Sequence, residues 1–114
     1  MTALLVALGA AVGGPLRYLC SETLDGRWPL GTFVVNTLGS ALAGVFAALS
    51  LDGHTWAFAF TGFCGALTSF SALAVQAVDR GPRLGLAYAV STAAAALVLC
   101  AGGFALAHEL VLQA

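Results

Sequence analysis

Four long segments without a charged side chain constrain the fold of this chain more than any other feature. They span roughly residues 2–16, 28–51, 53–78 and 84–108. A bilayer core is about 30 Å thick, and a helix needs about 20 residues to cross it. Only 8% of the residues are charged, whereas soluble domains carry about 25%. The pattern predicts an all-α, multi-pass protein of the cell inner or plasma membrane.

The predicted transmembrane helices use nearly the whole chain. They are expected over roughly 2–19, 29–51, 54–78 and 84–108. Residues 1–114 are therefore expected to form a single domain. The first segment has a cleavable signal peptide as its alternative. It lacks a positively charged start and a clear cleavage site, so we expect a first span.

The net charge and the spacing of the cysteines bear on whether the chain binds nucleic acid or zinc or forms a disulfide. The net charge is −1, so no nucleic-acid partner is expected. The three cysteines, Cys20, Cys64 and Cys100, are widely spaced, with no CxxC pair and no cysteine–histidine cluster. They are expected to be apolar packing residues, not zinc ligands or a disulfide pair.

Arginine is distributed unevenly between the two sides of the membrane. With four spans, loops 20–28 and 79–83 share one side, and the termini share the other with turn 52–53. All the arginines fall in or next to the first pair of loops: Arg17, Arg27, Arg80 and Arg83. The positive-inside rule places these loops in the cytoplasm.

Asn36 is the polar residue of the second segment that most needs an explanation. It lies seven residues beyond Pro29, about 10 Å into the membrane. Thr32 lies four residues earlier, on the same helical face. One interpretation is an interhelical hydrogen bond, worth about 0.6 kcal/mol. The other is a pore face that offers amide and hydroxyl hydrogens to an ion.

Residues 62–73 concentrate glycine and hydroxyl groups in the middle of the third segment. Three hydroxyl residues follow Gly62 and Gly65 closely: Thr68, Ser69 and Ser71. Such hydroxyls often bond back to carbonyls of their own helix. The glycines favour a helix break, which would free carbonyl oxygens for a hard cation. Phe70 could present its positive ring edge to a small anion.

The positions of the titratable side chains do not fit two classes of protein, enzymes with a nucleophilic serine and small multidrug exporters. A nucleophilic serine would need a base within about 3 Å, and His54 and His108 lie at the ends of their spans. An enzyme is therefore not expected. Small multidrug exporters need a glutamate embedded in their first span, but Glu22 lies beyond that span.

Three motifs resemble, in family order, those of the Fluc (CrcB) fluoride channels. The family pattern G-A-x-x-R-Y is similar to Gly-Gly-Pro-Leu-Arg-Tyr at 13–18. The pattern P-x-G-T-x-x-V-N-x-x-G resembles Pro-Leu-Gly-Thr-Phe-Val-Val-Asn-Thr-Leu-Gly at 29–39. The pattern G-F-x-G-G-x-T-T-F-S resembles Gly-Phe-Cys-Gly-Ala-Leu-Thr-Ser-Phe-Ser at 62–71.

The resemblance implies a passive channel that lowers cytoplasmic fluoride, built as an antiparallel dimer with two pores and a break in helix 3. The matched pore and vestibule residues are Thr32, Asn36, Phe70, Ser71, Tyr88, Thr92 and Arg17. It also implies that backbone carbonyls of Gly65 and Thr68 from both subunits hold a structural sodium ion, which is not transported. The expected partners are fluoride, membrane lipid and a second Fluc-type subunit.

Two residues depart from the family pattern. The Gly14-Pro15 pair stands where the pattern begins its A-x-x run, and Pro15 is expected only to bend helix 1, whereas Leu73 replaces the second pore phenylalanine. An antiparallel homodimer also calls for little arginine bias. The bias and Leu73 together favour a heterodimer with a paralogue over a homodimer. A pore-decayed structural or regulatory subunit and a small coupled exporter remain as alternatives.

Overall fold

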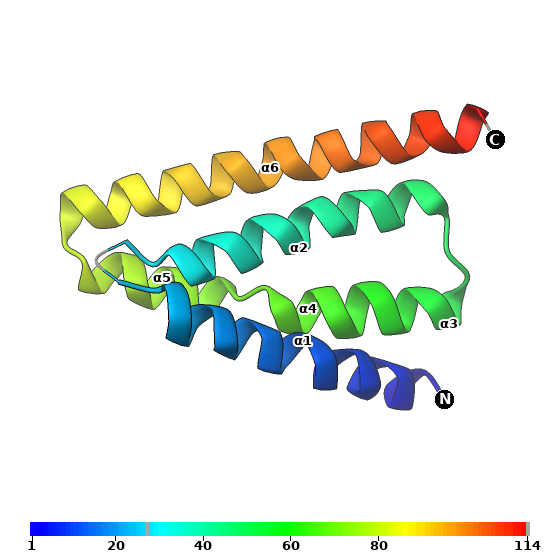
Figure 1. Cartoon of the computed structure of the whole chain (residues 1–114), viewed down its shortest axis with the longest axis horizontal. Helices are drawn as coiled ribbons and strands as arrows, with labels where there is room; N and C mark the ends of the chain where they lie inside the picture. The colour runs from blue at the N-terminus through cyan, green and yellow to red at the C-terminus, as the bar shows by residue number, and fades with distance from the viewer. Residues whose placement is uncertain (27, 114) are drawn as a thin grey trace.

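The computed structural model describes residues 1–26 and 28–113, and these residues are almost entirely helical. Arg27, one of the four arginines that the sequence places on one side of the membrane, lies outside the described residues. The first span is α1 (Thr2–Leu24), the second is α2 (Leu30–Leu49), and the fourth is α6 (Pro82–Gln113). The third span is divided into α3 (Gly53–Trp56), η1 (Ala57–Cys64), α4 (Gly65–Leu67) and α5 (Phe70–Asp79) (Figure 1).

The expected all-α membrane architecture is confirmed. Four helical segments in the described residues are long and apolar enough to cross a bilayer, and no β-strand occurs among these residues. Many of their large apolar side chains are exposed, as lipid contact requires, among them Leu97 and Val98.

Two helices are longer than the sequence predicted. Helix α1 continues past residue 19 to Leu24, because Ser21 and its neighbours can remain helical where water reaches the backbone. Helix α6 begins at Pro82, which suits a first helical position, and ends at Gln113 instead of near 108. The polar connection between the first two spans is therefore short.

The turn between the second and third spans is built from two local devices. Ser50 ends α2 in the left-handed conformation, with φ 53° and ψ 51°. Asp52 then caps α3, and its carboxylate accepts a hydrogen bond of 2.9 Å from the Thr55 N–H. The two spans consequently run antiparallel (Figure 1).

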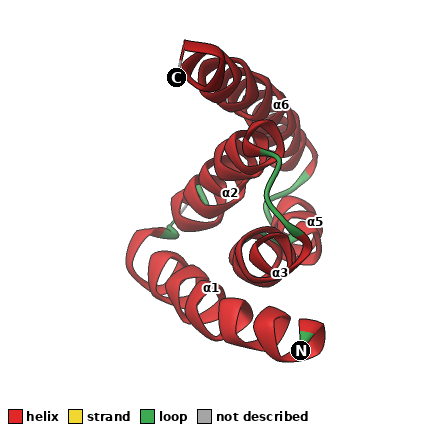
Figure 2. Cartoon of the chain, turned by 90° about the vertical axis from the view of Figure 1, so that its right-hand side faces the viewer, coloured by secondary structure: helices red, strands yellow, loops and turns green. Residues whose placement is uncertain are grey.

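These antiparallel neighbours pack mainly on other helices. Helix α1 packs on η1, and α2 packs on α6. Figure 2 shows α2 and α6 together on one side, with α1 and the third span on the other. At the first seam, a Cβ added to Gly9 or Gly13 would collide with the backbone of η1. Gly9 and Gly13 are four residues apart, a GxxxG spacing that allows two membrane helices to approach closely.

The third span changes its helical geometry before it is interrupted. Residues Ala57–Cys64 form a π-helix, and Gly65 is helical with φ −61° and ψ −39°. Thr68 and Ser69 then have extended backbones, with φ −89° and −152°. This geometry is consistent with the expected break in helix 3. Of the two residues expected at the break, Thr68 is extended and Gly65 remains helical; the second extended residue is Ser69.

Candidate functional site

An open groove of about 430 Å³ runs beside the interruption of the third span. Its walls come from α2, from the extended pair Thr68–Ser69, from α5 and from α6. Three of the predicted pore residues line it together: Asn36, Phe70 and Thr92. Leu73, the departure from the family pattern, lines it as well. The tertiary structure thus brings together Asn36 and Thr92, which are 56 positions apart in the sequence.

Asn36 holds the groove by pairing with the backbone of Ser69. The Ser69 N–H donates to Asn36 Oδ1 at 2.7 Å, and Asn36 Nδ2 donates to the Ser69 carbonyl at 3.3 Å. The Asn36 side chain is only 7% exposed. Its amide therefore acts like a peptide group of a neighbouring strand and satisfies the backbone that the interruption exposes.

The two interpretations of Asn36 are compatible in this geometry. The pairing with Ser69 is an interhelical hydrogen bond. An asparagine amide carries two hydrogens, and the Ser69 carbonyl takes one of them. The second hydrogen can serve another acceptor in the groove.

Phe70 begins α5 on the groove wall and is 80% exposed. Its position is set by Ser69, whose hydroxyl accepts a hydrogen bond of 3.1 Å from the Ala72 N–H and so caps α5. The Ser71 hydroxyl lies 3.2 Å from the Ser69 hydroxyl. The ring of Phe70 and the hydroxyl of Ser71 therefore both project from the first turn of this helix.

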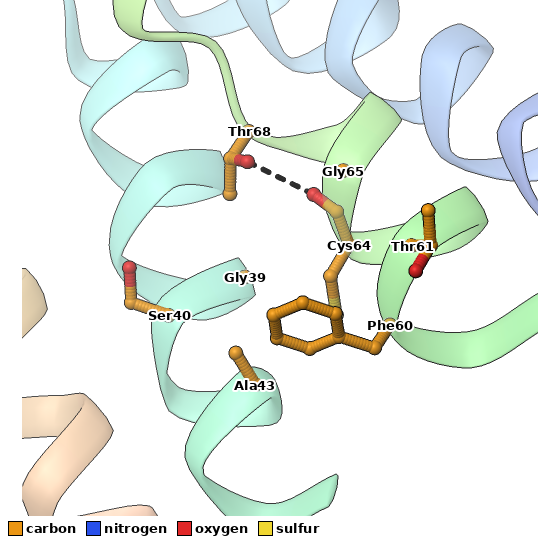
Figure 3. Close-up of a pocket in the computed structure, with 8 residues that line it drawn as sticks. All are labelled: Gly39, Ser40, Ala43, Phe60, Thr61, Cys64, Gly65 and Thr68. Atoms are coloured by element: carbon orange, nitrogen blue, oxygen red, sulfur yellow. Dashed lines mark hydrogen bonds between the residues drawn. The ribbon is translucent and has the colours of Figure 1, made fainter. Parts of the chain in front are cut away.

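A second cavity, of about 340 Å³, lies between α2 and the third span (Figure 3). Its lining combines small and polar residues: Gly39, Ser40, Ala43, Phe60, Thr61, Cys64, Gly65 and Thr68. The Thr68 hydroxyl donates back to the Cys64 carbonyl at 2.9 Å, as Figure 3 shows. This is the back-bonding that hydroxyl residues commonly make in membrane helices.

The interruption deprives the carbonyls of residues 65–68 of their α-helical donors, those of Gly65 and Thr68 among them. In a continuous α-helix, the Gly65 carbonyl would accept from the Ser69 N–H and the Thr68 carbonyl from the Ala72 N–H. The Ser69 N–H instead donates to Asn36 Oδ1, and the Ala72 N–H donates to the Ser69 hydroxyl. The carbonyls without an α-helical donor therefore include those of Gly65 and Thr68, the two residues predicted to hold sodium.

Thr32 and Tyr88 belong to a different cluster, at the end of α2 nearest the α1–α2 connection. They are buried, with exposures of 1% and 0%. The Tyr88 hydroxyl donates to Gln76 Oε1 at 3.0 Å, and Gln76 Nε2 donates to Asp25 Oδ2 at 3.1 Å. Thr32 donates to the same carboxylate through its N–H and its hydroxyl.

Asp25 and Gln76 were missed by the sequence analysis. Gln76 is an amide inside an apolar span, seven residues after Ser69, and this is the same kind of signal that identified Asn36. Asp25 looked like an ordinary loop residue. Nothing local indicates that its carboxylate meets Gln76, which lies 51 residues away in the sequence.

The remaining predicted residues lie apart from the groove or join the two clusters. Arg17 is half-buried on α1 and is not among the residues that line the groove. Thr92 lines the groove, and its hydroxyl donates to the Tyr88 carbonyl at 2.7 Å, one helical turn away. Thr92 therefore connects the groove to the cluster that contains Thr32.

Comparisons with known proteins agree in their assignment. The family described as CrcB-like protein, camphor resistance (CrcB), matches residues 4–104. A protein of Rhodococcus jostii named fluoride-specific ion channel FluC 2 is 40% identical over 93% of this chain and 98% of its own length. One of Natronomonas pharaonis with the same name is 40% identical over 96% and 97%. The fluoride-specific ion channel FluC of Bordetella petrii is 38% identical over 94% and 91%.

Proposed function

The chain belongs to the CrcB family, and from this premise we propose that it is a subunit of a fluoride-specific channel. The channel lets fluoride leave the cell passively and so lowers the fluoride concentration in the cytoplasm. This is ion conduction through a multi-pass membrane protein, not enzymatic catalysis. The observation that carries the proposal is the groove in which Asn36 and Phe70 meet beside the interrupted helix.

The chemistry of the groove suits a small, strongly hydrated anion. A pore must replace the hydration shell with hydrogen-bond donors, yet bind weakly enough to release the ion. In the groove, Asn36 supplies an amide hydrogen and Phe70 a positive ring edge. Ser71 does not line the groove itself, but its hydroxyl lies 3.2 Å from that of Ser69, which does. Among the described residues, no arginine lines the groove, so fluoride meets no full positive charge from them that would trap it.

A structural sodium ion fits the freed backbone oxygens. Sodium is a hard cation that takes oxygen ligands, and unwound helix carbonyls are a known way to provide them. The Gly65 and Thr68 carbonyls have lost their α-helical donors to Asn36 and to Ser69. A second subunit, placed against the cavity between α2 and the third span, would contribute the matching pair of oxygens.

The second subunit is proposed to pack antiparallel, within membrane lipid. A lone subunit leaves both the groove and this cavity open on one side, and Phe70 is largely exposed there. Leu73 offers no polar ring edge to the groove, and the arginines lie on one side in the sequence. These two features favour a paralogue as the partner over an identical chain.

The alternative functions make different demands on the same residues. A pore-decayed subunit would not need Asn36 and Phe70 to share a groove, although Leu73 does favour some loss of pore function. A coupled exporter would need an acidic residue within a span. In the described residues, the groove has no acidic lining. Glu22 lies within α1 and not beyond the first span as expected, but, like Asp79 in α5 and Glu109 in α6, it lies near the end of its helix.

The test is fluoride efflux from liposomes, measured with a fluoride electrode, for the wild-type chain, Asn36→Asp and Thr37→Val. Asn36→Asp keeps the acceptor for the Ser69 N–H but brings a negative charge into the groove. Repulsion between unit charges about 4 Å apart is about 4 kcal/mol at an effective dielectric constant of about 20, enough for a thousandfold slower flux. Thr37→Val is the matched control, because the Thr37 hydroxyl only bonds carbonyls of its own helix.

Three outcomes separate the proposals. Wild-type efflux that Asn36→Asp abolishes and Thr37→Val preserves supports the fluoride pathway through this groove. Unchanged efflux in Asn36→Asp would remove Asn36 from the pathway. Robust efflux by the chain alone would contradict the need for a paralogous partner.

A further inference from the structure

The carboxylate of Asp25 accepts hydrogen bonds from two residues, the buried Thr32 and the half-buried Gln76. Asp25 Oδ1 accepts from the Thr32 N–H at 3.1 Å. Asp25 Oδ2 accepts from the Thr32 hydroxyl at 3.2 Å and from Gln76 Nε2 at 3.1 Å. Donors on α2 and α5 therefore converge on one anionic group at the end of α1.

The hydrogen bonds behind these donors all point the same way. A hydroxyl has one hydrogen, and that of Thr32 goes to Asp25, so the Ser21 hydroxyl must donate in its 3.2 Å contact with Thr32. Gln76 Oε1 accepts from Tyr88, and this orients the Gln76 NH₂ group toward Asp25. Asp25 is the final acceptor of both chains.

The hydrogen bond from the Thr32 hydroxyl to Asp25 conflicts with a role of Thr32 in binding a passing anion. While its only hydroxyl hydrogen is bonded to Asp25, Thr32 can offer that hydrogen to nothing else. Positive charge lies close by, because Arg80 donates to the Gly26 carbonyl at 3.0 Å and to the Gln76 carbonyl at 3.3 Å. The donors and the arginine together could bind an anion, and the carboxylate of Asp25 occupies that position.

Helix capping alone does not explain this arrangement. Capping α2 requires only the bond from the Thr32 N–H to Oδ1. Asp52 provides the comparison, because it accepts from the Thr55 N–H at 2.9 Å and from the Thr55 hydroxyl at 3.1 Å. Asp25 has the same two bonds to a threonine and, in addition, the bond from Gln76 on a distant helix.

We propose that Asp25 is a positioning residue whose carboxylate competes with fluoride for the hydrogens of Thr32 and Gln76. This inference rests on the proposed function. Fluoride entering this end of the pathway displaces the carboxylate, accepts the two hydrogens, and returns them to Asp25 when it leaves. Asp25 thereby keeps the donors oriented when no fluoride is bound and prevents the ion from binding too tightly.

The first test compares fluoride efflux from liposomes at low fluoride concentration. Asp25→Asn and Asp25→Ser keep a capping side chain but remove the negative competitor. Removing one charge-assisted competitor corresponds to about a tenfold gain, so the half-saturating fluoride concentration should fall about tenfold. Asp52→Asn is the matched control and should behave like the wild type. A half-saturating concentration in the neutral Asp25 variants equal to or above the wild-type value would overturn the inference.

A second measurement decides the case in which no variant transports fluoride by itself, a result that the need for a paralogous partner also predicts. The side-chain amide signal of Gln76 is followed by nitrogen-15 NMR in detergent micelles during a fluoride titration. We expect the signal to shift at about tenfold lower fluoride in either neutral Asp25 variant than in the wild type. Equal midpoints, or no response in any protein, would show that Asp25 does not compete with fluoride.

Discussion

Replacing Asn36 by alanine tests the pairing that holds the interrupted span. The substitution removes both hydrogen bonds to Ser69, of 2.7 and 3.3 Å. Interhelical hydrogen bonds in membranes average about 0.6 kcal/mol, so the pair is worth about 1 kcal/mol. An unsatisfied Ser69 N–H would add about 1 to 3 kcal/mol. We expect the free energy of unfolding to fall by about 2 kcal/mol.

The Ser69 carbonyl limits the size of this loss. It still accepts the Leu73 N–H at 3.3 Å after Asn36 has been truncated, so only the Ser69 N–H loses its partner. That N–H can regain a partner by closing the helix onto the Gly65 carbonyl, its α-helical acceptor. Such a closure would reduce the loss to about 1 kcal/mol, but it would use an oxygen proposed for sodium. Sodium-dependent stability should therefore weaken together with the pairing.

The assay is denaturant unfolding in detergent, followed by the fluorescence of Trp28 and Trp56, with and without sodium. Ser40→Ala is the matched control, because the Ser40 hydroxyl lines the same groove but donates only to the Asn36 carbonyl one turn earlier. This control should stay within about 0.5 kcal/mol of the wild type. An Asn36→Ala protein as stable as Ser40→Ala would refute the argument that Asn36 satisfies the interrupted backbone.

Two further predictions concern the α1 seam and the α3 cap. A Cβ at Gly13 would collide with the Phe63 carbonyl, whereas a Cβ at Gly14 would meet nothing within 4 Å. Gly13→Ala should therefore lower the free energy of unfolding by about 1 to 3 kcal/mol, while Gly14→Ala raises it by up to about 1 kcal/mol; equal effects in the unfolding assay would contradict the packing of α1 on η1. Hydrogen bonds from the Thr55 N–H, and next from its hydroxyl, lower the pKa of Asp52 below its ordinary 3.8. Because the folded pKa is depressed, the stability that Asp52 contributes is present above pH 3.8 and is lost as the pH falls through the folded value. The difference in unfolding free energy between wild type and Asp52→Asn should therefore be constant from neutral pH down to pH 3.8 and shrink below it; a difference that shrinks well above that pH would show that the cap does not depend on the Asp52 charge.

The sequence predicted the parts of the site that obey local rules. The second and third spans contain polar residues where lipid would tolerate none, and this alone marked Asn36, Thr68 and Ser69 as residues that need a partner or an ion. The GxxxG spacing likewise marked Gly9 and Gly13 as a packing seam. In each case the bilayer is the solvent, and it leaves a polar group or a pair of small residues few alternatives to contact with another helix or an ion.

The exact position of the interruption in the third span could not be predicted from the sequence. Glycine raises the chance of a break, but Gly65 stays helical and the extended residues are Thr68 and Ser69. The deciding factor is Asn36, whose amide can replace the helical partners of Ser69 from 33 residues away. Local propensity cannot reveal such a partner, because the compensating hydrogen bonds come from another helix.

The sequence by itself determined that this chain crosses the membrane as helices. The polar backbone must satisfy its hydrogen bonds internally in a bilayer core, and uncharged segments of about 20 residues or more have the length of helices, not of barrel strands. Its motifs also determined the family. Only the tertiary structure decided which polar groups meet. It paired Asn36 with Ser69, and it brought Thr32 and Gln76 to the carboxylate of Asp25. These contacts join segments 7, 33 and 51 residues apart, and side-chain hydrogen bonds act only over about 3 Å, so the packing of the helices had to set them.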